Sequence, residues 1–404
     1  MIDSNTDIVR DPNVKTILQV LPAMSVGGVE RGTVEVAQAL VRSGWRSIVA
    51  SAGGQFVREL EKCGAEHIEL PLQTKSPLAI RRNSHALAEI ISDEKISLVH
   101  ARSRAPAWSA HAAAQKANVP FVTTFHGYYG TGVFGLKKIW NRIMSKGRPV
   151  IAISEFIADH IIAEYHTDPK DVVLIHRGVD LSMFDPAAVT PARMIKLASE
   201  WRLPDDGLVV MLPGRLSRWK GQSLLISAIA ELAKAGELPE NLRCLMVAPQ
   251  PARSSYRRSL DAKVRTLGLE GCVQIIDNCR DIAAAYMVTD VVVSGSTRPE
   301  AFGRVVAEAQ AMGRPVVAPA FGGAPEILLP AVTGWLYTPS DPVSLAQSIA
   351  RAIALTRDQR DELKRMAREH VAKNFTVEQM TDATLAVYDS VLNGAYPVSA
   401  RNND

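Results

Sequence analysis

The chain has 404 residues, of which 47% are hydrophobic and 22% charged, and its formal net charge is +4. This length exceeds what one hydrophobic core normally holds, so the sequence predicts two globular domains. The small positive charge does not indicate a nucleic-acid-binding protein, although it suits anionic ligands or a lipid surface. The cysteines are scattered, so we expect neither a disulfide framework nor a zinc site; they are Cys63, Cys244, Cys272 and Cys279.

Targeting signals are not evident in the sequence. Three acidic residues, Asp3, Asp7 and Asp11, precede the first apolar run, which is unlike a secretory signal peptide. No stretch of roughly 20 uncharged apolar residues is present that would predict a membrane-spanning helix. We therefore expect a protein of the reducing cytoplasm.

Strand-like and helix-like patterns alternate through the first half of the chain. Short apolar stretches predict strands, and periodic stretches between them predict helices. The predicted strands cover 16–21, 47–51, 67–70, 98–100, 121–125 and 150–153, and the predicted helices cover 31–43, 56–63, 83–94 and 106–117. Such alternation is typical of βαβ units around a parallel sheet. The sequence therefore predicts a doubly wound α/β domain over residues 1–185.

The same alternation resumes after Pro186. The predicted strands cover 209–212, 243–247, 273–276 and 291–293, and the predicted helices cover 223–235, 256–266, 282–288 and 303–312. This pattern predicts a second doubly wound α/β domain over residues 186–374. Ligands of such tandem pairs are expected in the cleft that the two domains face.

Two carboxylates lie in the stretch from Ser294 to Ala318. Glu300 follows the apolar run 291–293, and Glu308 lies on the helical pattern that Gly303 opens. Loops at the carboxyl ends of strands bind ligands in open α/β sheets, and a helix N-terminus attracts an anion. The pair therefore suits a nucleotide sugar, with hydroxyls on the acids and phosphate at the helix end. The ordinary alternative is a solvated loop acid and a surface helix acid.

A basic loop follows the predicted strand 209–212. It reads Gly214-Arg215-Leu-Ser-Arg-Trp-Lys220-Gly221. A guanidinium fork and an ammonium suit two phosphates, and they would offset the charge of a departing diphosphate without a metal. The chain has no Asp-x-Asp, which is a common metal–diphosphate clamp. A merely solvated basic loop is the alternative.

Two further candidates come from the first half of the chain. Gly27 and Gly28 follow the first strand, where the lack of side chains lets the backbone approach a phosphate or sugar. The spacing is not G-x-G-x-x-G, so NAD is not expected. His126 follows the strand 121–125 and is placed to hydrogen-bond a sugar hydroxyl or a developing charge. An ordinary turn and a structural histidine are the alternatives.

In order and spacing, these motifs resemble the family 4 retaining glycosyltransferases of the GT-B fold. The resemblance covers nearly the whole chain. It rests on Gly27-Gly28, His126-Gly127, Ser154-Glu155-Phe156, Arg177-Gly178-Val179-Asp180, Gly214-Arg215 with Lys220-Gly221, Glu300 with Glu308, and Gly322-Gly323-Ala324-Pro325-Glu326.

The resemblance implies a role for each donor-side residue. Arg215 and Lys220 would hold the donor diphosphate, and Glu308 would bind the ribose hydroxyls. Glu300 would bind the hydroxyls of the transferred sugar. The backbone N–H groups that would help it belong to Ala301, Phe302 and Gly303.

The resemblance also assigns the remaining segments. Gly27 and Gly28 would lie near donor and acceptor, and His126 would contact the sugar's 6-hydroxyl. The C-terminal segment 375–404 would carry a helix that crosses back to the first domain. The chain departs from the family pattern at one place. The family often has Gly-Asp-Gly-Pro where this chain has Ala248-Pro-Gln-Pro251, in a loop near the nucleotide base, so the resemblance does not indicate which base the donor carries.

The implied activity is sugar transfer from a UDP- or GDP-sugar to a glycan or lipid-linked acceptor, as in cell-envelope polysaccharide or lipopolysaccharide biosynthesis. The nucleotide sugar is a substrate, so no cofactor and no metal are expected. Two alternatives stay open. A GT-B-type sugar-nucleotide 2-epimerase would need no acceptor, and a non-catalytic nucleotide-sugar-binding subunit would show no turnover.

A basic amphipathic helix is predicted from Phe134 to Lys146. Its apolar face would hold Leu136, Ile139, Trp140, Ile143 and Met144, and its basic face Lys138, Arg142 and Lys146, with Lys137 at the boundary. This composition is typical of a segment that lies in a lipid headgroup layer, so we expect peripheral contact with the inner face of the cytoplasmic membrane. A surface helix packed on its own domain is the alternative.

Overall fold

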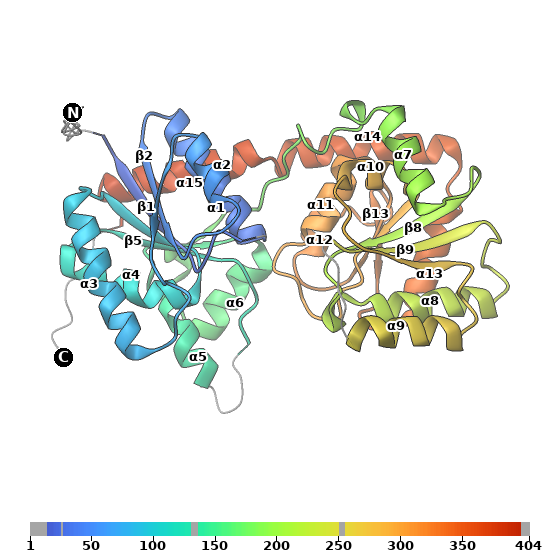
Figure 1. The fold of residues 1–404 in the computed structure, drawn as a ribbon, viewed down its shortest axis with the longest axis horizontal. Coiled ribbons are helices and arrows are strands. Elements are labelled where there is room, and N and C mark those ends of the chain that lie inside the picture. The colour runs from blue at the N-terminus through green and yellow to red at the C-terminus, as the bar shows by residue number, and fades with distance from the viewer. Residues whose placement is uncertain (1–13, 26, 131–135, 250–254, 397–404) are drawn as a thin grey trace, which may run out of the picture. The chain divides into compact units, whose positions relative to one another are not determined.

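The computed structural model describes residues 14–25, 27–130, 136–249 and 255–396. The chain divides into two compact units (Figure 1). Unit 1 comprises Met1–Ile175 with Met380–Asp404, and unit 2 comprises His176–Gln379.

Unit 1 is built on a seven-stranded sheet in which every paired strand is parallel. Its order is β3-β2-β1-β4-β5-β6-β7. The strands are β1 (Thr16–Val20), β2 (Arg46–Ser51), β3 (Glu66–Glu69), β4 (Leu98–Ala101), β5 (Phe121–Phe125), β6 (Val150–Ala152) and β7 (Val172–Leu174). β1, β4 and β5 are buried throughout, because helices cover both faces of the sheet. The reversal of strand order between β1 and β4 makes the sheet doubly wound.

Helices alternate with the strands of unit 1 along the chain. They are α1 (Gly28–Arg42), α2 (Val57–Lys62), α3 (Pro77–Asp93), α4 (Arg104–Ala117), α5 (Leu136–Asn141), the 3-10 helix Arg142–Lys146, and α6 (Glu155–Tyr165). The Ser154 hydroxyl caps α6 by accepting from the Ile157 N–H at 3.1 Å.

The last helix, α15 (Val377–Leu392), contributes to the core of unit 1. Tyr388 and Val391 pack with Ile17 of β1 and Leu40 of α1. The Tyr388 hydroxyl also bonds the Nδ1 of buried His100 at 2.5 Å. Burial of this apolar stripe explains why α15 from Met380 onward belongs to unit 1.

Unit 2 repeats the architecture with a six-stranded parallel sheet of order β10-β9-β8-β11-β12-β13. The strands are β8 (Leu208–Pro213), β9 (Leu242–Val247), β10 (Val273–Ile276), β11 (Val291–Val293), β12 (Val316–Pro319) and β13 (Gly334–Tyr337). The helices are α7 (Pro191–Trp201), α8 (Gln222–Lys234), α9 (Ser255–Thr266), α10 (Ile282–Met287), α11 (Arg304–Ala311), α12 (Ala324–Ile327), α13 (Pro342–Ile353) and α14 (Arg357–Asn374).

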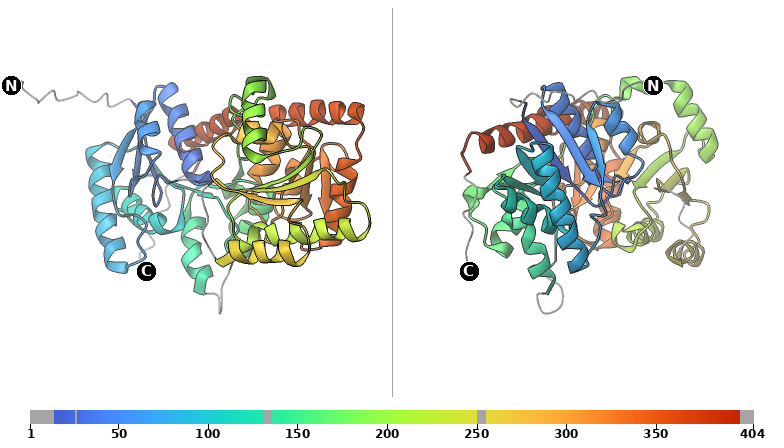
Figure 2. Two further views of the ribbon diagram at one scale, coloured as in Figure 1. Left: turned by 45° about the vertical axis from the view of Figure 1, so that its right-hand side comes forward. Right: turned by 60° about the vertical axis from the view of Figure 1, so that its left-hand side comes forward.

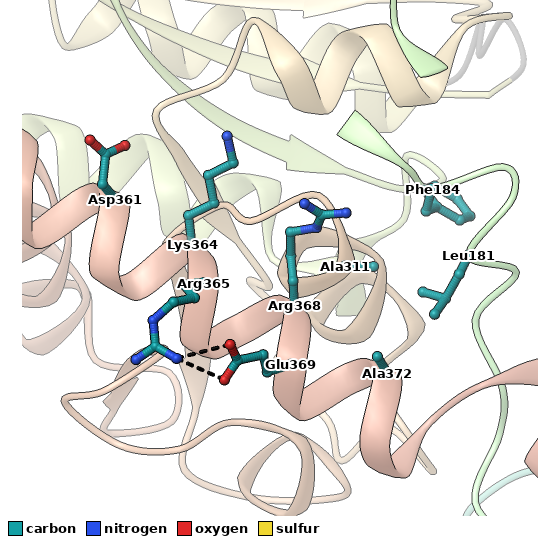
Figure 3. A pocket seen from close by; sticks show the side chains of 9 residues that line it. All are labelled: Leu181, Phe184, Ala311, Asp361, Lys364, Arg365, Arg368, Glu369 and Ala372. Carbon is teal, nitrogen blue, oxygen red and sulfur yellow. Dashed lines mark hydrogen bonds and ion pairs between the residues drawn. The ribbon is translucent and has the colours of Figure 1, made fainter. Parts of the chain in front are cut away.

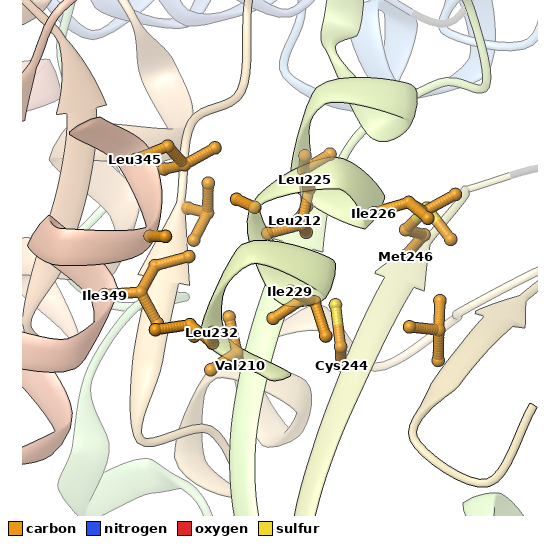
Figure 4. Packing of buried hydrophobic residues seen from close by; sticks show 14 of the residues in the cluster. Val210, Leu212, Leu225, Ile226, Ile229, Leu232, Cys244, Met246, Leu345 and Ile349 are labelled. Atoms are coloured by element: carbon orange, nitrogen blue, oxygen red, sulfur yellow. The ribbon is translucent and has the colours of Figure 1, made fainter. Parts of the chain in front are cut away.

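The core of unit 2 lies on both sides of its sheet. On one side, leucine and isoleucine side chains of α8 and α13 form one cluster with residues of β8 and β9, as Figure 4 shows for Leu225, Ile229 and Ile349. The strands that α13 itself lies against are β11, β12 and β13. On the other side, α11 packs against α14 and β12. Figure 2 shows the same layers in two further views.

The unit boundaries differ from the predicted ends at residues 185 and 374. The first falls after Ile175 and the second after Gln379. The reason is a backbone pairing inside unit 2: the Val179 N–H donates to the Phe375 carbonyl at 2.8 Å, and Val377 N–H donates back to Val179 at 3.2 Å. Gly178 permits this approach, since a Cβ there would lie 2.5 Å from the Thr376 oxygen.

The order of the strands in the sheet indicates where the candidate site of unit 2 lies. β8 and β11 are neighbours, and the order of the sheet reverses between them. Ligands of open α/β sheets bind beyond the carboxyl ends of strands at such a switch point. The basic loop follows β8 and the loop of Glu300 follows β11, so both motifs leave the sheet at this point.

Candidate active site

The two motifs of unit 2 meet through their side chains. Lys220 lies at the end of the 3-10 helix Arg218–Lys220, and its Nζ donates to Oε1 of Glu300 at 2.7 Å. The Ser296 hydroxyl donates to the same oxygen. The side chains of Lys220 and Glu300 are only 15% and 18% exposed. The contact therefore joins an ammonium and a carboxylate in a sheltered position at the switch point.

Glycines let the two loops approach each other. Gly221 has φ +76°, and a Cβ on it would lie 1.6 Å from the Gly295 carbonyl oxygen. The Thr297 N–H donates to the Trp219 carbonyl at 2.8 Å, which ties the same loops by their backbones. The Lys220–Glu300 contact is thus built on a close backbone approach that a side chain at 221 would prevent.

The loop of Glu300 is also held from the side of β12. The Gly323 N–H donates to the Glu300 carbonyl at 2.9 Å. Gly322, with φ +68°, approaches so closely that a Cβ would lie 2.6 Å from the same oxygen. The Gly322-Gly323 pair therefore fixes the backbone from which the Glu300 side chain extends.

Three backbone N–H groups follow Glu300. Those of Ala301, Phe302 and Gly303 make no hydrogen bond to any residue that the structure describes. Gly303 is the N-cap of α11 and adopts φ +107°, a left-handed conformation that suits glycine. Unpaired N–H groups at a helix start are suited to an anion or a sugar hydroxyl.

Glu308 lies one to two turns into α11 and is 8% exposed. Both of its carboxylate oxygens have donors: the Tyr286 hydroxyl reaches Oε2 at 3.0 Å, and the Arg304 Nη2 reaches Oε1 at 2.8 Å. Two donors compensate for the loss of water around a buried carboxylate. Each oxygen keeps a lone pair for a further donor such as a hydroxyl.

Arg215 presents its guanidinium to solvent. The side chain is exposed, and within the described ranges it forms no ion pair. Its backbone is fixed, because the Gln222 Nε2 donates to the Arg215 carbonyl at 3.0 Å. A free guanidinium close in sequence to the paired Lys220 is suited to bind a phosphate in bidentate fashion.

Gly27, Gly28 and His126 belong to unit 1, whereas the other predicted site residues belong to unit 2. Gly27 is the N-cap of α1, and Gly28 begins that helix directly after the β1 loop. His126 follows the last residue of β5 and is half-buried. All three therefore lie beyond the carboxyl edge of a parallel sheet. Within the described residues, no three His, Cys, Asp or Glu side chains are grouped as a metal site requires.

A cavity of about 560 Å³ lies elsewhere in unit 2, between α14, the end of α11 and the segment of Leu181 and Phe184 (Figure 3). Its wall carries Lys364 and Arg368 of α14, while Arg365 pairs with Glu369 at 2.9 Å. None of the predicted site residues lines it. Ala311, which does, lies on the helix that carries Glu308.

Comparisons with known proteins decide the family. Residues 26–183 match the family model described as Glycosyltransferase Family 4, and residues 193–370 match that of the glycosyl transferases group 1. A solved glycosyltransferase of Rickettsia africae ESF-5 is 37% identical, with a TM-score of 0.86, over 95% of this chain and 100% of that one. The chain belongs to the family 4 glycosyltransferases of the GT-B fold. The predicted family and fold class are confirmed.

Two further comparisons concern a solved structure of the same fold and a curated protein. Anabaena Alr3699/HepE, solved in complex with UDP and glucose, shares the fold at 24% identity and a TM-score of 0.79, over 93% of this chain and 100% of that one. The D-inositol 3-phosphate glycosyltransferase 1 of Catenulispora acidiphila is 34% identical over 59% of this chain and 56% of its own length. The matched segment thus spans about half of such curated relatives.

Three residues that contact the candidate site residues were not predicted: Tyr286, Ser296 and Arg304. Arg304 precedes Glu308 by one helical turn, and that i, i+4 spacing of opposite charges could have identified it. Ser296 carries no signal beyond its closeness to Glu300 in sequence. Tyr286 belongs to a different helix, α10, and only the packing of α10 beside α11 brings its hydroxyl to Glu308.

Proposed function

We propose that this chain is a retaining glycosyltransferase that moves a sugar from a UDP- or GDP-sugar to a glycan or lipid-linked acceptor. The observation that carries the proposal is the contact of Lys220 with Glu300 at the switch point of unit 2. It places a phosphate-binding cation next to a carboxylate that suits sugar hydroxyls, which is what a sugar diphosphate requires.

Residues of unit 2 would hold the donor at three of its chemical groups. Arg215 and Lys220 bind the diphosphate, and Glu308 binds the ribose hydroxyls. Glu300 and the free N–H groups of Ala301–Gly303 bind the transferred sugar. As the bond from the sugar's C1 to the diphosphate oxygen breaks, negative charge builds on that oxygen, and the two cations stabilise it. The proposal includes neither a metal nor a cofactor, since an arginine and a lysine supply the positive charge.

The anomeric configuration would be retained because the acceptor attacks C1 of the sugar on the same face from which the leaving group departs. The acceptor hydroxyl forms the new bond to C1, and its proton passes to the oxygen of the leaving diphosphate. Positioning is the main contribution of the protein, because well-oriented groups reach effective molarities worth about 7–11 kcal/mol. In this scheme His126 and the Gly27-Gly28 turn of unit 1 contact the donor sugar and the acceptor.

UDP-sugars are the first donors to test, because Alr3699/HepE binds UDP. The Ala248-Pro249-Gln250-Pro251 segment, which departs from the family pattern near the base, extends outside the described residues. For the acceptor, we propose a cell-envelope polysaccharide or lipopolysaccharide intermediate. An inositol phosphate is the second acceptor to test, on the strength of the names of the curated relatives.

A lipid-linked acceptor would be reached at the membrane surface. The predicted basic helix is shorter than expected: α5 spans Leu136–Asn141, and Phe134 lies outside the described residues. Its apolar face is divided, since Ile143 and Met144 are buried whereas Leu136 and Ile139 are 68% and 66% exposed. Part of the face therefore packs on unit 1, as the alternative predicted.

The exposed part of α5 and its flanks is both apolar and basic. Lys137, Arg142 and Lys146 are exposed, whereas Lys138 pairs with Glu164 at 3.0 Å. We propose that Leu136 and Ile139 enter an anionic headgroup layer with these bases around them, which gives peripheral association on the cytoplasmic side. None of the helices in the described ranges combines the length and apolar character needed to cross a bilayer.

A donor-hydrolysis screen tests the activity. UDP-, GDP- and ADP-sugars are incubated with the protein, and released nucleotide is measured with and without candidate acceptors. We expect nucleotide release from one class of donor, with the anomeric configuration retained in the product. Conversion of the donor's sugar to its 2-epimer without acceptor would replace the proposal by the epimerase. Binding of donors without turnover by any acceptor would favour a non-catalytic subunit.

A further inference from the structure

Glu308 depends on a tyrosine that lies on another helix. The Tyr286 hydroxyl donates to Oε2 of Glu308 at 3.0 Å, and the tyrosine is completely buried. Arg304 occupies Oε1 from the same helix as Glu308, so it moves with α11. Tyr286 instead belongs to α10. Its hydrogen bond therefore fixes the position of the Glu308 carboxylate relative to an element of unit 2 other than α11.

The position of Tyr286 is fixed by its own surroundings. The Asp281 carboxylate caps α10 by accepting from the Ala284 N–H at 3.0 Å. Asp281 also accepts from Arg193 of α7 at 2.7 and 2.8 Å. Phe184, which lines the cavity of Figure 3, packs edge-on against the Tyr286 ring with 6.0 Å between centroids. The start of α10 and the ring of Tyr286 thus each have a partner outside the helix, which limits how far the tyrosine can follow a carboxylate that shifts.

The tyrosine hydroxyl remains protonated and can only act as the donor in this pair. Burial, and then the negative charge of Glu308, raise the pKa of Tyr286 well above its ordinary value of 10. A hydrogen bond from a neutral donor to a buried carboxylate is among the stronger kinds. Because the donor direction is fixed, the bond orients the carboxylate plane of Glu308.

We propose that Tyr286 is a positioning residue that sets the rotamer of Glu308 and thereby the affinity of the site for a nucleotide's ribose. The inference rests on the proposed function, in which Glu308 accepts hydrogen bonds from the ribose hydroxyls. Tyr286 does not touch the donor in this scheme. Its effect passes entirely through the carboxylate.

The Tyr286→Phe variant tests this, because it keeps the ring and its contact with Phe184 and removes one hydroxyl. We expect the Kd for UDP to rise about fivefold to tenfold, which corresponds to about 1 kcal/mol of binding free energy. The Kd for inorganic pyrophosphate should not change, because pyrophosphate has no ribose. In turnover assays the donor KM should rise while kcat stays within about twofold, since ribose contacts are equal in ground and transition states.

Two further variants separate positioning from a general structural effect. In a Glu308→Ala background the Tyr286→Phe change should add nothing to the Kd for UDP, because the group through which it acts is gone. Tyr388→Phe in unit 1 is the matched control: it removes a buried hydroxyl that bonds His100, and it should leave both Kd values unchanged. Thermal unfolding of all variants shows how much stability each hydroxyl supplies.

Isothermal titration calorimetry with UDP and pyrophosphate gives the result. A UDP Kd for Tyr286→Phe equal to that of the wild type, or an equal weakening of UDP and pyrophosphate, would overturn the inference alone. An additive loss in the double variant would also overturn it. If the wild-type protein binds pyrophosphate, and binds no nucleoside diphosphate more tightly than pyrophosphate, then Glu308 does not bind a ribose. In that case the proposed function is wrong as well.

Discussion

The ammonium of Lys220 lies 2.7 Å from the Oε1 of Glu300, although the two residues are 80 positions apart in the sequence. One is the cation expected to bind phosphate, and the other is the carboxylate expected to bind the sugar. An ammonium has three N–H donors, so Lys220 can keep Glu300 and still bind a phosphate oxygen. The pair therefore holds the carboxylate proposed to bind the sugar and the cation proposed to bind phosphate in a fixed arrangement relative to each other.

Removing the ammonium should affect both partners of the pair. We expect Lys220→Ala to lower kcat by about 10²–10³-fold, the loss typical of one donor aimed at developing negative charge. Lys234→Ala is the control, because Lys234 lies on α8 in the same unit, is itself exposed, and pairs with half-buried Glu231 of the same helix. Steady-state kinetics with saturating donor measure both. A loss confined to KM would show that Lys220 binds ground and transition states equally.

Substitutions of Glu300 and Glu308 should affect different kinetic constants. Glu300→Gln should mainly lower kcat, because contacts to the reacting sugar strengthen as charge develops at C1. Glu308→Gln should mainly raise the donor KM, because its ribose contacts do not change during the reaction. Initial rates over a range of donor concentrations separate the two constants. Equal changes in both constants for both variants would contradict this division of roles.

Gly221 should be much less replaceable than a glycine with the same backbone conformation elsewhere. Gly221→Ala suffers a left-handed φ of +76° and a clash with the Gly295 carbonyl. Gly236→Ala, at φ +71° with nothing within 4 Å, suffers only the conformational cost of about 1–2 kcal/mol. We expect Gly221→Ala to lower the free energy of unfolding by at least about 2 kcal/mol more than Gly236→Ala does. Denaturant titrations compare the two variants, and equal destabilisation would mean that the loops separate freely.

Vesicle binding should depend on the exposed face of α5. We expect sedimentation with anionic vesicles at low salt, and its loss in Leu136→Ser/Ile139→Ser and in Lys137→Glu/Arg142→Glu. Each basic residue contributes about 1 kcal/mol near an anionic surface, so binding should weaken as salt rises. Ile195→Ser, which changes an exposed isoleucine of α7 in unit 2, is the control. Binding that all variants retain, or that the wild type lacks, would contradict the membrane proposal.

The sequence by itself determined the alternation of strands and helices. β5, β10 and β11 have the predicted bounds. β5 and β11 are covered on both faces, and each is a short buried run that polar loops interrupt, whereas β10 lies at an edge of its sheet with Gln274 exposed. β7, β12 and β13 were not predicted. β7 and β13 are short and half-buried at an edge of their sheets, so their patterns are weak, whereas β12 is a buried strand of four residues inside its sheet. α3 was predicted to begin at Asn83 but begins at Pro77, a residue type that favours the first helical position.

From the sequence, the motifs of the candidate site could be predicted one by one, but their closeness in space could not. Local patterns place Arg215, Lys220, Glu300 and Glu308 after particular strands, since the carboxyl end of a strand can be recognised from its apolar run. They do not reveal which strands are neighbours. Only the tertiary structure pairs β8 with β11 and so brings Lys220 onto Glu300. It also packs α10 beside α11 and so brings Tyr286 to Glu308, because a hydrogen bond between distant residues depends on packing that no local pattern encodes.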